Sequence, residues 1–219
     1  MNITNDKVTE YINGFYKPLT PELGALRLEA EENRVPIILK ETESWLWTLL
    51  STLKPKRILE IGTAVAYSTM FFAEVCGDCH IDTIEFSETN YEIAKENVKK
   101  LGMEHKISIH HGDGAEQTER LRENGAECYD LVFIDASKSH YKEFWEAAIK
   151  LCKPGSIIIS DNVLMKAMTV SDEYDVKGRH KTNIRRMREY VEFIHQLDYC
   201  KTSVMAIGDG IAYSIITEK

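Results

Sequence analysis

Five short apolar runs between residues 57 and 162 constrain the fold of this chain more than any other feature. They read RILEIG, HIDTIE, KISIHHG, YDLVFIDA and GSIIISDN, and all are rich in β-branched residues. Amphipathic segments such as SETNYEIAKENVKKLG and SHYKEFWEAAIKLC lie between them. Strands that alternate with helices of this length predict βαβ units and a parallel sheet covered on both faces. The fold class we expect is therefore α/β.

The two ends of the chain depart from this alternation. Residues 1–53 place apolar residues three and four apart, which predicts a helical extension. Near the other end, YCKTSVMAIGDGIAYSIIT contains two β-like runs joined through an Asp-Gly pair, which predicts an antiparallel hairpin at a sheet edge. We expect one domain over residues 1–219, with the α/β core over 56–219.

Composition excludes several classes of protein. No apolar run approaches the roughly 20 residues that a membrane-spanning helix needs, and the N-terminus lacks the pattern of a signal peptide, so we expect a cytoplasmic protein. Five scattered cysteines argue for reduced thiols rather than a disulfide framework. The net charge of −8 argues against a nucleic-acid footprint spread over the whole surface.

Acidic residues follow every one of the five predicted strands. In an open parallel sheet, ligands bind beyond the carboxyl ends of the strands, so these residues should meet at one edge. The first turn, EIGTAVAYS, is not a GxGxxG loop, and the chain has no Walker lysine motif. A ligand bound through its phosphates is therefore not expected. The acids in question are Glu60, Glu85, Asp113, Asp135 and Asp161.

The position of one acid suggests the ligand. Glu85 lies 23 residues after Gly62, where a carboxylate can bind both hydroxyls of a ribose. A ligand with a ribose, an adenine, a positive centre and no phosphate fits an acidic crevice best, and S-adenosylmethionine is such a ligand. The predicted cofactor-binding residues are Ile38, Glu60, Gly62, Thr63, Ser68, Glu85, Asp113, Gly114 and Asp135.

The ends of the fourth and fifth runs also predict a metal site. Asp135 closes one run, and Asp161 and Asn162 close the next. Two carboxylates and a carboxamide form a hard oxygen site, suited to Mg²⁺ or another divalent cation, with positions left for two substrate oxygens and a water. The alternative is that these residues only terminate strands or cap turns, because Asp and Asn are common there.

The ordered motifs resemble a known family. LEIGTAVAYS, DTIEFS, HHGDGAE, FIDASKSHY and IIISDNVL are similar to the class I methyltransferases of the catechol and caffeoyl-CoA O-methyltransferase type, from VPIILK through to GDGIA. The resemblance implies a Rossmann-like, mostly parallel seven-stranded sheet with an antiparallel C-terminal hairpin. It also places the catalytic base at Lys138, whose alternative is an ordinary surface lysine. The chain departs from the family at Ala66, where glycine is usual.

A basic segment follows the predicted metal site. VKGRHKTNIRRMR, residues 176–188, contains six cations and no acid, although the protein is acidic overall. Such a segment can bind the phosphates of RNA or of an acyl-CoA thioester, or it can simply be a solvated helix face. The candidate RNA contacts are Lys177, Arg179, Lys181, Arg185 and Arg186.

The same motifs, with SDNVLMK and the arginine-rich helix start, bear a closer resemblance to bacterial tRNA 5-hydroxyuridine methyltransferases. That resemblance implies a homodimer that converts 5-hydroxyuridine at the wobble position of tRNA into 5-methoxyuridine. Two alternatives remain open. One is an O-methyltransferase of small catechols or caffeoyl-CoA-like esters. The other is a non-catalytic binding protein that has kept the fold, against which the presence of Asp135, Lys138, Asp161 and Asn162 argues.

Overall fold

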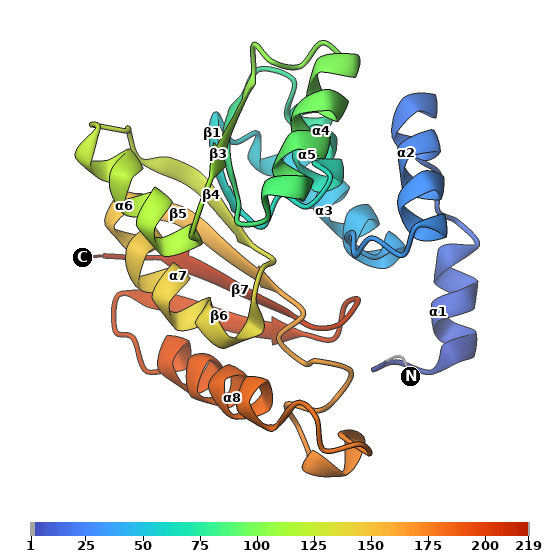
Figure 1. Cartoon of the computed structure of the whole chain (residues 1–219). Coiled ribbons are helices and arrows are strands. Elements are labelled where there is room, and N and C mark those ends of the chain that lie inside the picture. Colours follow the sequence, from blue (N-terminus) through green and yellow to red (C-terminus); the bar gives the residue numbers. More distant parts are fainter. Residues whose placement is uncertain (1–2, 219) are drawn as a thin grey trace.

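A computed structural model describes residues 3–218 (Figure 1). The described chain forms a seven-stranded sheet with the order β3-β2-β1-β4-β5-β7-β6. Strands β1 to β5 pair in parallel, and β7 runs antiparallel between β5 and β6. The predicted α/β sheet and its edge hairpin are therefore confirmed. The strands are β1 Arg57–Ile61, β2 His80–Glu85, β3 Ile107–His111, β4 Tyr129–Ile134, β5 Cys152–Asp161, β6 Cys200–Met205 and β7 Ile211–Ile216.

Successive side chains of the strands point to opposite sides of the sheet, so apolar strands give it two apolar faces. Helices cover both of these faces. Ile58 of β1 packs in one hydrophobic cluster and the adjacent Leu59 in another, and both are fully buried. Figure 1 shows one layer of helices on each side of the sheet. The first layer contains α3 Lys40–Leu53, α4 Tyr67–Cys76 and α5 Glu88–Lys100, and the second contains α6 Gly114–Glu123, α7 Tyr141–Ala148 and α8 Lys181–His195.

Short elements complete the chain. The N-terminal region adds α1 and α2, which lie beside α3 and away from the sheet (Figure 1). Pro21 occupies the first turn of α2, where its missing N–H costs nothing, and Thr20 caps that helix. None of the described helices is long and apolar enough to cross a membrane. The remaining bounds are α1 Asp6–Asn13, α2 Pro21–Glu32, and the 3-10 turns η1 Lys138–His140, η2 Ile149–Leu151 and η3 Asp172–Tyr174.

The carboxyl ends of β1, β2, β4 and β5 lie side by side. Ile61 pairs with Ile84 on one side and with Ile134 on the other, and Ile134 pairs with Ser160. The residues that follow these strands are therefore brought to one edge. The turn between β6 and β7 returns to the same edge, where Val163 N donates to the carbonyl of Gly210 at 2.9 Å.

Candidate functional site

A pocket of about 830 Å³ opens at this edge of the sheet, and its size suits a ligand of cofactor dimensions. It runs from the segment before α3, across the first loop of the sheet, to the end of β5. Most of the predicted cofactor, catalytic and metal residues line it. Those residues are Ile38, Gly62, Thr63, Ser68, Glu85, Asp113, Gly114, Asp135, Lys138 and Asn162.

Two glycines shape the pocket through close packing. Gly62 has a φ of +108°, and a Cβ there would lie 2.0 Å from the carbonyl oxygen of Asp135. A Cβ on Gly114 would lie 2.6 Å from Ile61 Cγ2 and 2.8 Å from Phe144 Cε1. Any side chain at either position would push apart the strand ends that form the pocket floor. Packing therefore requires glycine at both positions, whether or not a ligand contacts them.

Glu85 is held in place at the pocket wall by backbone groups. Its Oε2 accepts from Ala64 N at 2.8 Å and its Oε1 from Ser87 N at 2.8 Å. A carboxylate oxygen has two lone pairs, so each oxygen can still accept a hydroxyl of a ribose. Asp113 caps α6, since its Oδ1 accepts from Ala115 N at 2.9 Å. Asp113 therefore both caps α6 and lines the pocket.

Glu60 was predicted to bind the cofactor, but its carboxylate lies beneath the pocket and does not line it. Its Oε1 accepts from Ser68 Oγ at 2.5 Å, and its Oε2 accepts from Thr83 Oγ1 at 2.6 Å and also from Thr69 Oγ1. Burial raises the pKa of Glu60 to about 7, although these three hydrogen bonds act against the rise. Glu60 thus supports Ser68, which does face the pocket.

The predicted metal residues meet at the end of β4 and β5. Asp135 and Asn162 line the pocket, whereas Asp161 is buried behind them and does not line it. Asp161 Oδ1 accepts from Asn162 N at 2.7 Å. Its Oδ2 is buried and has no hydrogen-bond partner among residues 3–218. Burial and the charge of Asp135 raise the pKa of Asp161 to about 7. A buried carboxylate oxygen without a partner is costly, and a cation would satisfy it. Asp135, Asp161 and Asn162 therefore fit a hard divalent cation.

Lys138 forms an ion pair with Asp135 and is not a solvated surface lysine, since only 23% of its side chain is exposed. Its Nζ donates to Asp135 Oδ1 and to Tyr141 Oη, each at 2.9 Å. Tyr141 Oη in turn donates to the carbonyl of Asp161 at 2.8 Å. Burial lowers the pKa of Lys138, but Tyr141 and Asp135 outweigh burial and raise it. The protein groups alone therefore keep Lys138 protonated.

Several residues that line the pocket or support its lining were not predicted from the sequence. Tyr141 connects Lys138 to β5, and Phe86, 76% exposed, follows β2 at the pocket wall. Asp209 lies in the turn between β6 and β7, where its Oδ1 accepts from Lys166 N, and burial raises its pKa. The sequence signal for Asp209 was present in GDG, but that motif predicts only a turn. The turn between β6 and β7 could not be assigned to the pocket from the sequence, because the position of this hairpin in the strand order was not known.

The basic segment lies outside the pocket lining. Arg188 is held by protein groups, since its Nε donates to the Thr169 carbonyl at 2.8 Å and its Nη2 lies 2.8 Å from Asp172. Arg185 and Arg186 are exposed and both approach Glu189, at 2.8 and 3.7 Å. Arg188 therefore anchors the preceding turn, and the other five cations of the segment are exposed: Lys177, Arg179, Lys181, Arg185 and Arg186.

Comparison with known proteins agrees with this geometry. The O-methyltransferase family model matches residues 21–216. A catechol O-methyltransferase from Niastella koreensis is 30% identical over 166 residues, which cover 74% of this chain and 75% of that protein. A crystal structure from Staphylococcus aureus, provisionally assigned as a caffeoyl-CoA O-methyltransferase, superposes with a TM-score of 0.86 at 32% identity and covers 97% of this chain and 99% of that one.

The chain therefore belongs to the O-methyltransferase family, as its motifs predicted. A more distant structure shares the fold. The O-methyltransferase from Bacillus cereus, solved in complex with S-adenosylhomocysteine, has a TM-score of 0.83 at 22% identity, with 96% of this chain and 97% of that one covered. The Rossmann-like methyltransferase fold is thus confirmed.

Proposed function

We propose that the protein transfers a methyl group from S-adenosylmethionine to a hydroxyl that lies beside a second oxygen, and that it needs a divalent cation. The unpartnered Oδ2 of Asp161, buried next to Asp135 and Lys138 at the pocket edge, carries this proposal. A divalent cation would compensate this buried acid, and Lys138 beside it supplies a group for proton transfer that a purely binding site does not need.

Residues at the other end of the pocket suit S-adenosylmethionine as the cofactor. Glu85 has free lone pairs for the ribose hydroxyls, and the acidic crevice suits the sulfonium charge. S-adenosylhomocysteine bound to the Bacillus cereus relative is the product of the same cofactor. A bound cation, Mg²⁺ or a similar ion, would lower the pKa of the acceptor hydroxyl and fix its oxygen.

The reaction is an in-line displacement. The acceptor oxygen forms a bond to the methyl carbon while the carbon–sulfur bond breaks, and the electron pair returns to sulfur to give S-adenosylhomocysteine. The hydroxyl proton leaves to a base, for which Lys138 is the candidate. Lys138 can accept this proton only as the neutral amine, so its own proton must first leave to solvent. That loss requires weaker contacts with Asp135 and Tyr141, because both hold the proton on Lys138. The geometry of Asp135 thus controls the base.

For the substrate we favour 5-hydroxyuridine at the wobble position of tRNA. Its 5-hydroxyl lies beside the 4-carbonyl and supplies the two adjacent oxygens. Exposed cations, among them Lys177 and Arg179, precede and begin α8 in an otherwise acidic protein, and they would contact RNA phosphates. The sequence resemblance to bacterial tRNA 5-hydroxyuridine methyltransferases supports the same substrate.

A second candidate is favoured by the relatives. A catechol O-methyltransferase and a provisionally assigned caffeoyl-CoA O-methyltransferase are among them, so a small phenol or a caffeoyl-CoA-like ester is the alternative acceptor. In that case the catalytic corner is unchanged, and the basic segment binds the phosphates of coenzyme A or only solvent.

Nucleoside mass spectrometry tests the proposal directly. Purified protein is incubated with S-adenosylmethionine, Mg²⁺ and tRNA that carries 5-hydroxyuridine, and a new 5-methoxyuridine peak that EDTA removes is expected. The Arg185→Glu, Arg186→Glu variant should lose tRNA methylation and keep catechol turnover. A matched control, Lys95→Glu with Lys99→Glu on α5, should leave both unchanged. Catechol methylation without any tRNA product would establish the second candidate.

We also propose, from the resemblance, that the protein is a homodimer. Large apolar side chains of α1, and one two residues beyond its end, are exposed and would supply surface for a second copy. Light scattering measures the mass, and a monomer at micromolar concentration would contradict the proposal. The exposed side chains are Val8, Tyr11, Ile12 and Phe15.

A further inference from the structure

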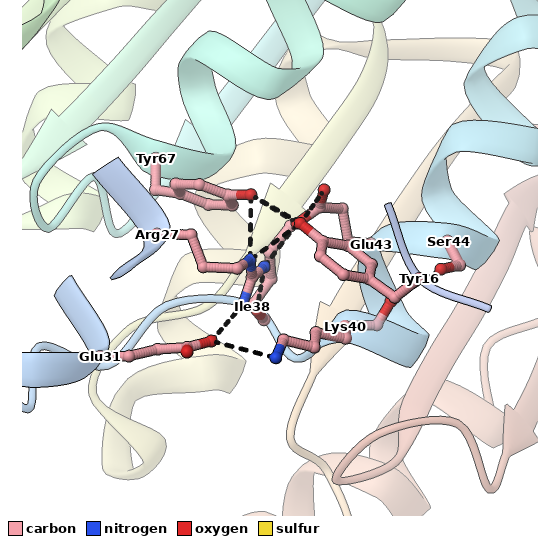
Figure 2. A network of polar contacts seen from close by, with 8 residues as sticks. All are labelled: Tyr16, Arg27, Glu31, Ile38, Lys40, Glu43, Ser44 and Tyr67. Carbon is pink, nitrogen blue, oxygen red and sulfur yellow. Dashed lines mark hydrogen bonds and ion pairs between the residues drawn. The ribbon is translucent and has the colours of Figure 1, made fainter. Parts of the chain in front are cut away.

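A buried polar network joins the N-terminal helices to the wall of the pocket (Figure 2). At its centre is Arg27 of α2, which is only 4% exposed. Its Nε donates to Tyr16 Oη at 3.0 Å and to Tyr67 Oη at 3.1 Å, and its Nη2 donates to the Ile38 carbonyl at 2.9 Å. One guanidinium thus contacts the segment before α2, the segment before α3, and the start of α4.

Glu43 of α3 completes the network. It accepts from the Arg27 Nη2, from Tyr67 Oη at 2.7 Å and from Tyr16 Oη at 2.9 Å. The carboxylate is 2% exposed, so its charge is balanced by Arg27 rather than by water. Burying such a pair is unfavourable for each ion unless hydrogen bonds satisfy both, which this network provides. An apolar core would be simpler if stability were the only requirement.

Two members of the network belong to the pocket. Tyr67 and Ile38 line it, whereas Arg27, Glu43 and Tyr16 do not. Arg27 fixes Ile38 through its carbonyl and Tyr67 through its hydroxyl and its ring, whose centroid lies 4.6 Å from the guanidinium carbon. The two walls come from segments that are far apart in sequence. The distance between the Ile38 wall and the Tyr67 wall is therefore set by Arg27, which contacts both and does not itself line the pocket.

We infer that Arg27 is a positioning residue for the cofactor: it sets the spacing of the Ile38 and Tyr67 walls and so couples the docking of α1 and α2 to cofactor binding. This inference rests on the proposed function, since it takes S-adenosylmethionine as the ligand. Coupling is reciprocal. A cofactor that fits only the correctly spaced walls must in turn stabilise α2, although no residue of α2 lines the pocket.

Calorimetric titration with S-adenosylhomocysteine tests the first half. Arg27→Gln should weaken its Kd about tenfold, within the usual range of such coupling. At saturating S-adenosylmethionine, kcat should stay within about twofold, because the reacting atoms are untouched. Arg27→Lys keeps the charge but cannot reach Tyr67 and Ile38 together, so an intermediate Kd is expected.

Two further variants separate positioning from folding. Glu31→Gln removes the outer, half-exposed partner of Arg27, 3.1 Å from its Nη1, and should leave the Kd unchanged. Arg27→Gln with Glu43→Gln avoids a stranded buried charge and should fold while still binding S-adenosylhomocysteine weakly. A wild-type Kd in this double variant would overturn the inference.

Hydrogen exchange on the wild-type protein tests the second half without any variant. S-adenosylhomocysteine should slow amide exchange in residues 21–32 at least about threefold, as the reciprocal coupling requires. Protection limited to the pocket segments would overturn the inference. Failure of the wild-type protein to bind S-adenosylhomocysteine at all would instead overturn the proposed function, so the two failures are distinguishable.

Discussion

Two carboxylates near the ends of the strands that flank β4 are similarly buried but differ in their hydrogen-bond partners. Glu60 on β1 and Asp161 on β5 are both fully or nearly fully buried, and burial raises the pKa of each to about 7. Three side-chain hydroxyls satisfy Glu60. Asp161 accepts from one backbone N–H, and its second oxygen has no partner within residues 3–218.

The difference shows what marks a reaction centre in this sheet. A raised pKa alone does not, because Glu60 has one and yet only supports the loop above it. An unsatisfied buried oxygen next to a second carboxylate is the more specific sign, because a bound cation would compensate both charges. The hydrogen-bonding needs of the β1 end are therefore met within the protein, whereas at the β5 end the proposed cation would meet them.

Substituting each carboxylate should give the largest contrast. Asp161→Asn removes a charge that the cation needs, so kcat/KM should fall by about 100-fold or more, which corresponds to roughly 2.7 kcal/mol of transition-state stabilisation. Glu60→Gln removes the same charge from a support position, where it acts only through Ser68, and should cost about tenfold. Initial rates of S-adenosylhomocysteine formation measure both. Equal losses in the two variants would erase the distinction between the two strand ends.

The effect of added Mg²⁺ on the free energy of unfolding should also distinguish Asp161 from Glu60. At about pH 8, after EDTA treatment, Mg²⁺ at about 100 times its Kd should stabilise the protein by roughly 2.7 kcal/mol and raise Tm by about 5 °C or more. Glu60→Gln should keep this rise, and Asp161→Asn should lose it. Scanning calorimetry of the three proteins checks this. A rise that persists in Asp161→Asn would place the cation elsewhere.

The pH dependence of stability should show the contribution of Glu60. Its pKa is about 7 in the folded protein and near the ordinary value of about 4 in the unfolded chain. Between these values the folded state holds a proton that the unfolded chain has released, so stability falls as pH rises from about 4 to about 7. Urea midpoints in EDTA should fall less steeply for Glu60→Gln. An unchanged slope would mean that Glu60 is not buried as described.

The two strand ends also differ in how well the sequence predicted them. The structure brings Asp135, Asp161 and Asn162 to one edge of the sheet, as expected for residues at the carboxyl ends of neighbouring parallel strands, and their role as metal ligands stays a prediction. Glu60 follows the same pattern but lies beneath the pocket. Alternation along a strand decides which face a side chain occupies, and the last residues of β1 could not be assigned a face without the exact register.

The N-terminal network was not predicted for a different reason. Arg27 and Glu43 read as charged residues on amphipathic helices, and such residues are usually solvated. Their burial depends on how α2 and α3 pack against α4, a long-range arrangement that periodicity does not contain. Asp209 joins the pocket lining in the same way, from a turn distant in sequence, and Tyr141 contacts the Asp161 carbonyl across 20 residues.

The smallest expected effect concerns backbone strain at the two strand ends. Ala66 after β1 and Asn162 after β5 both have left-handed backbone, with φ of +65° and +63°. Alanine loses about 1–2 kcal/mol there, whereas asparagine tolerates the region through its polar side chain. Glycine relieves this strain but adds about 0.5–1 kcal/mol of entropy in the unfolded chain. Ala66→Gly should therefore be more favourable than Asn162→Gly by roughly 1 kcal/mol of unfolding free energy. Urea unfolding in EDTA measures both, and the opposite order would show that packing of the buried Ala66 methyl outweighs the strain.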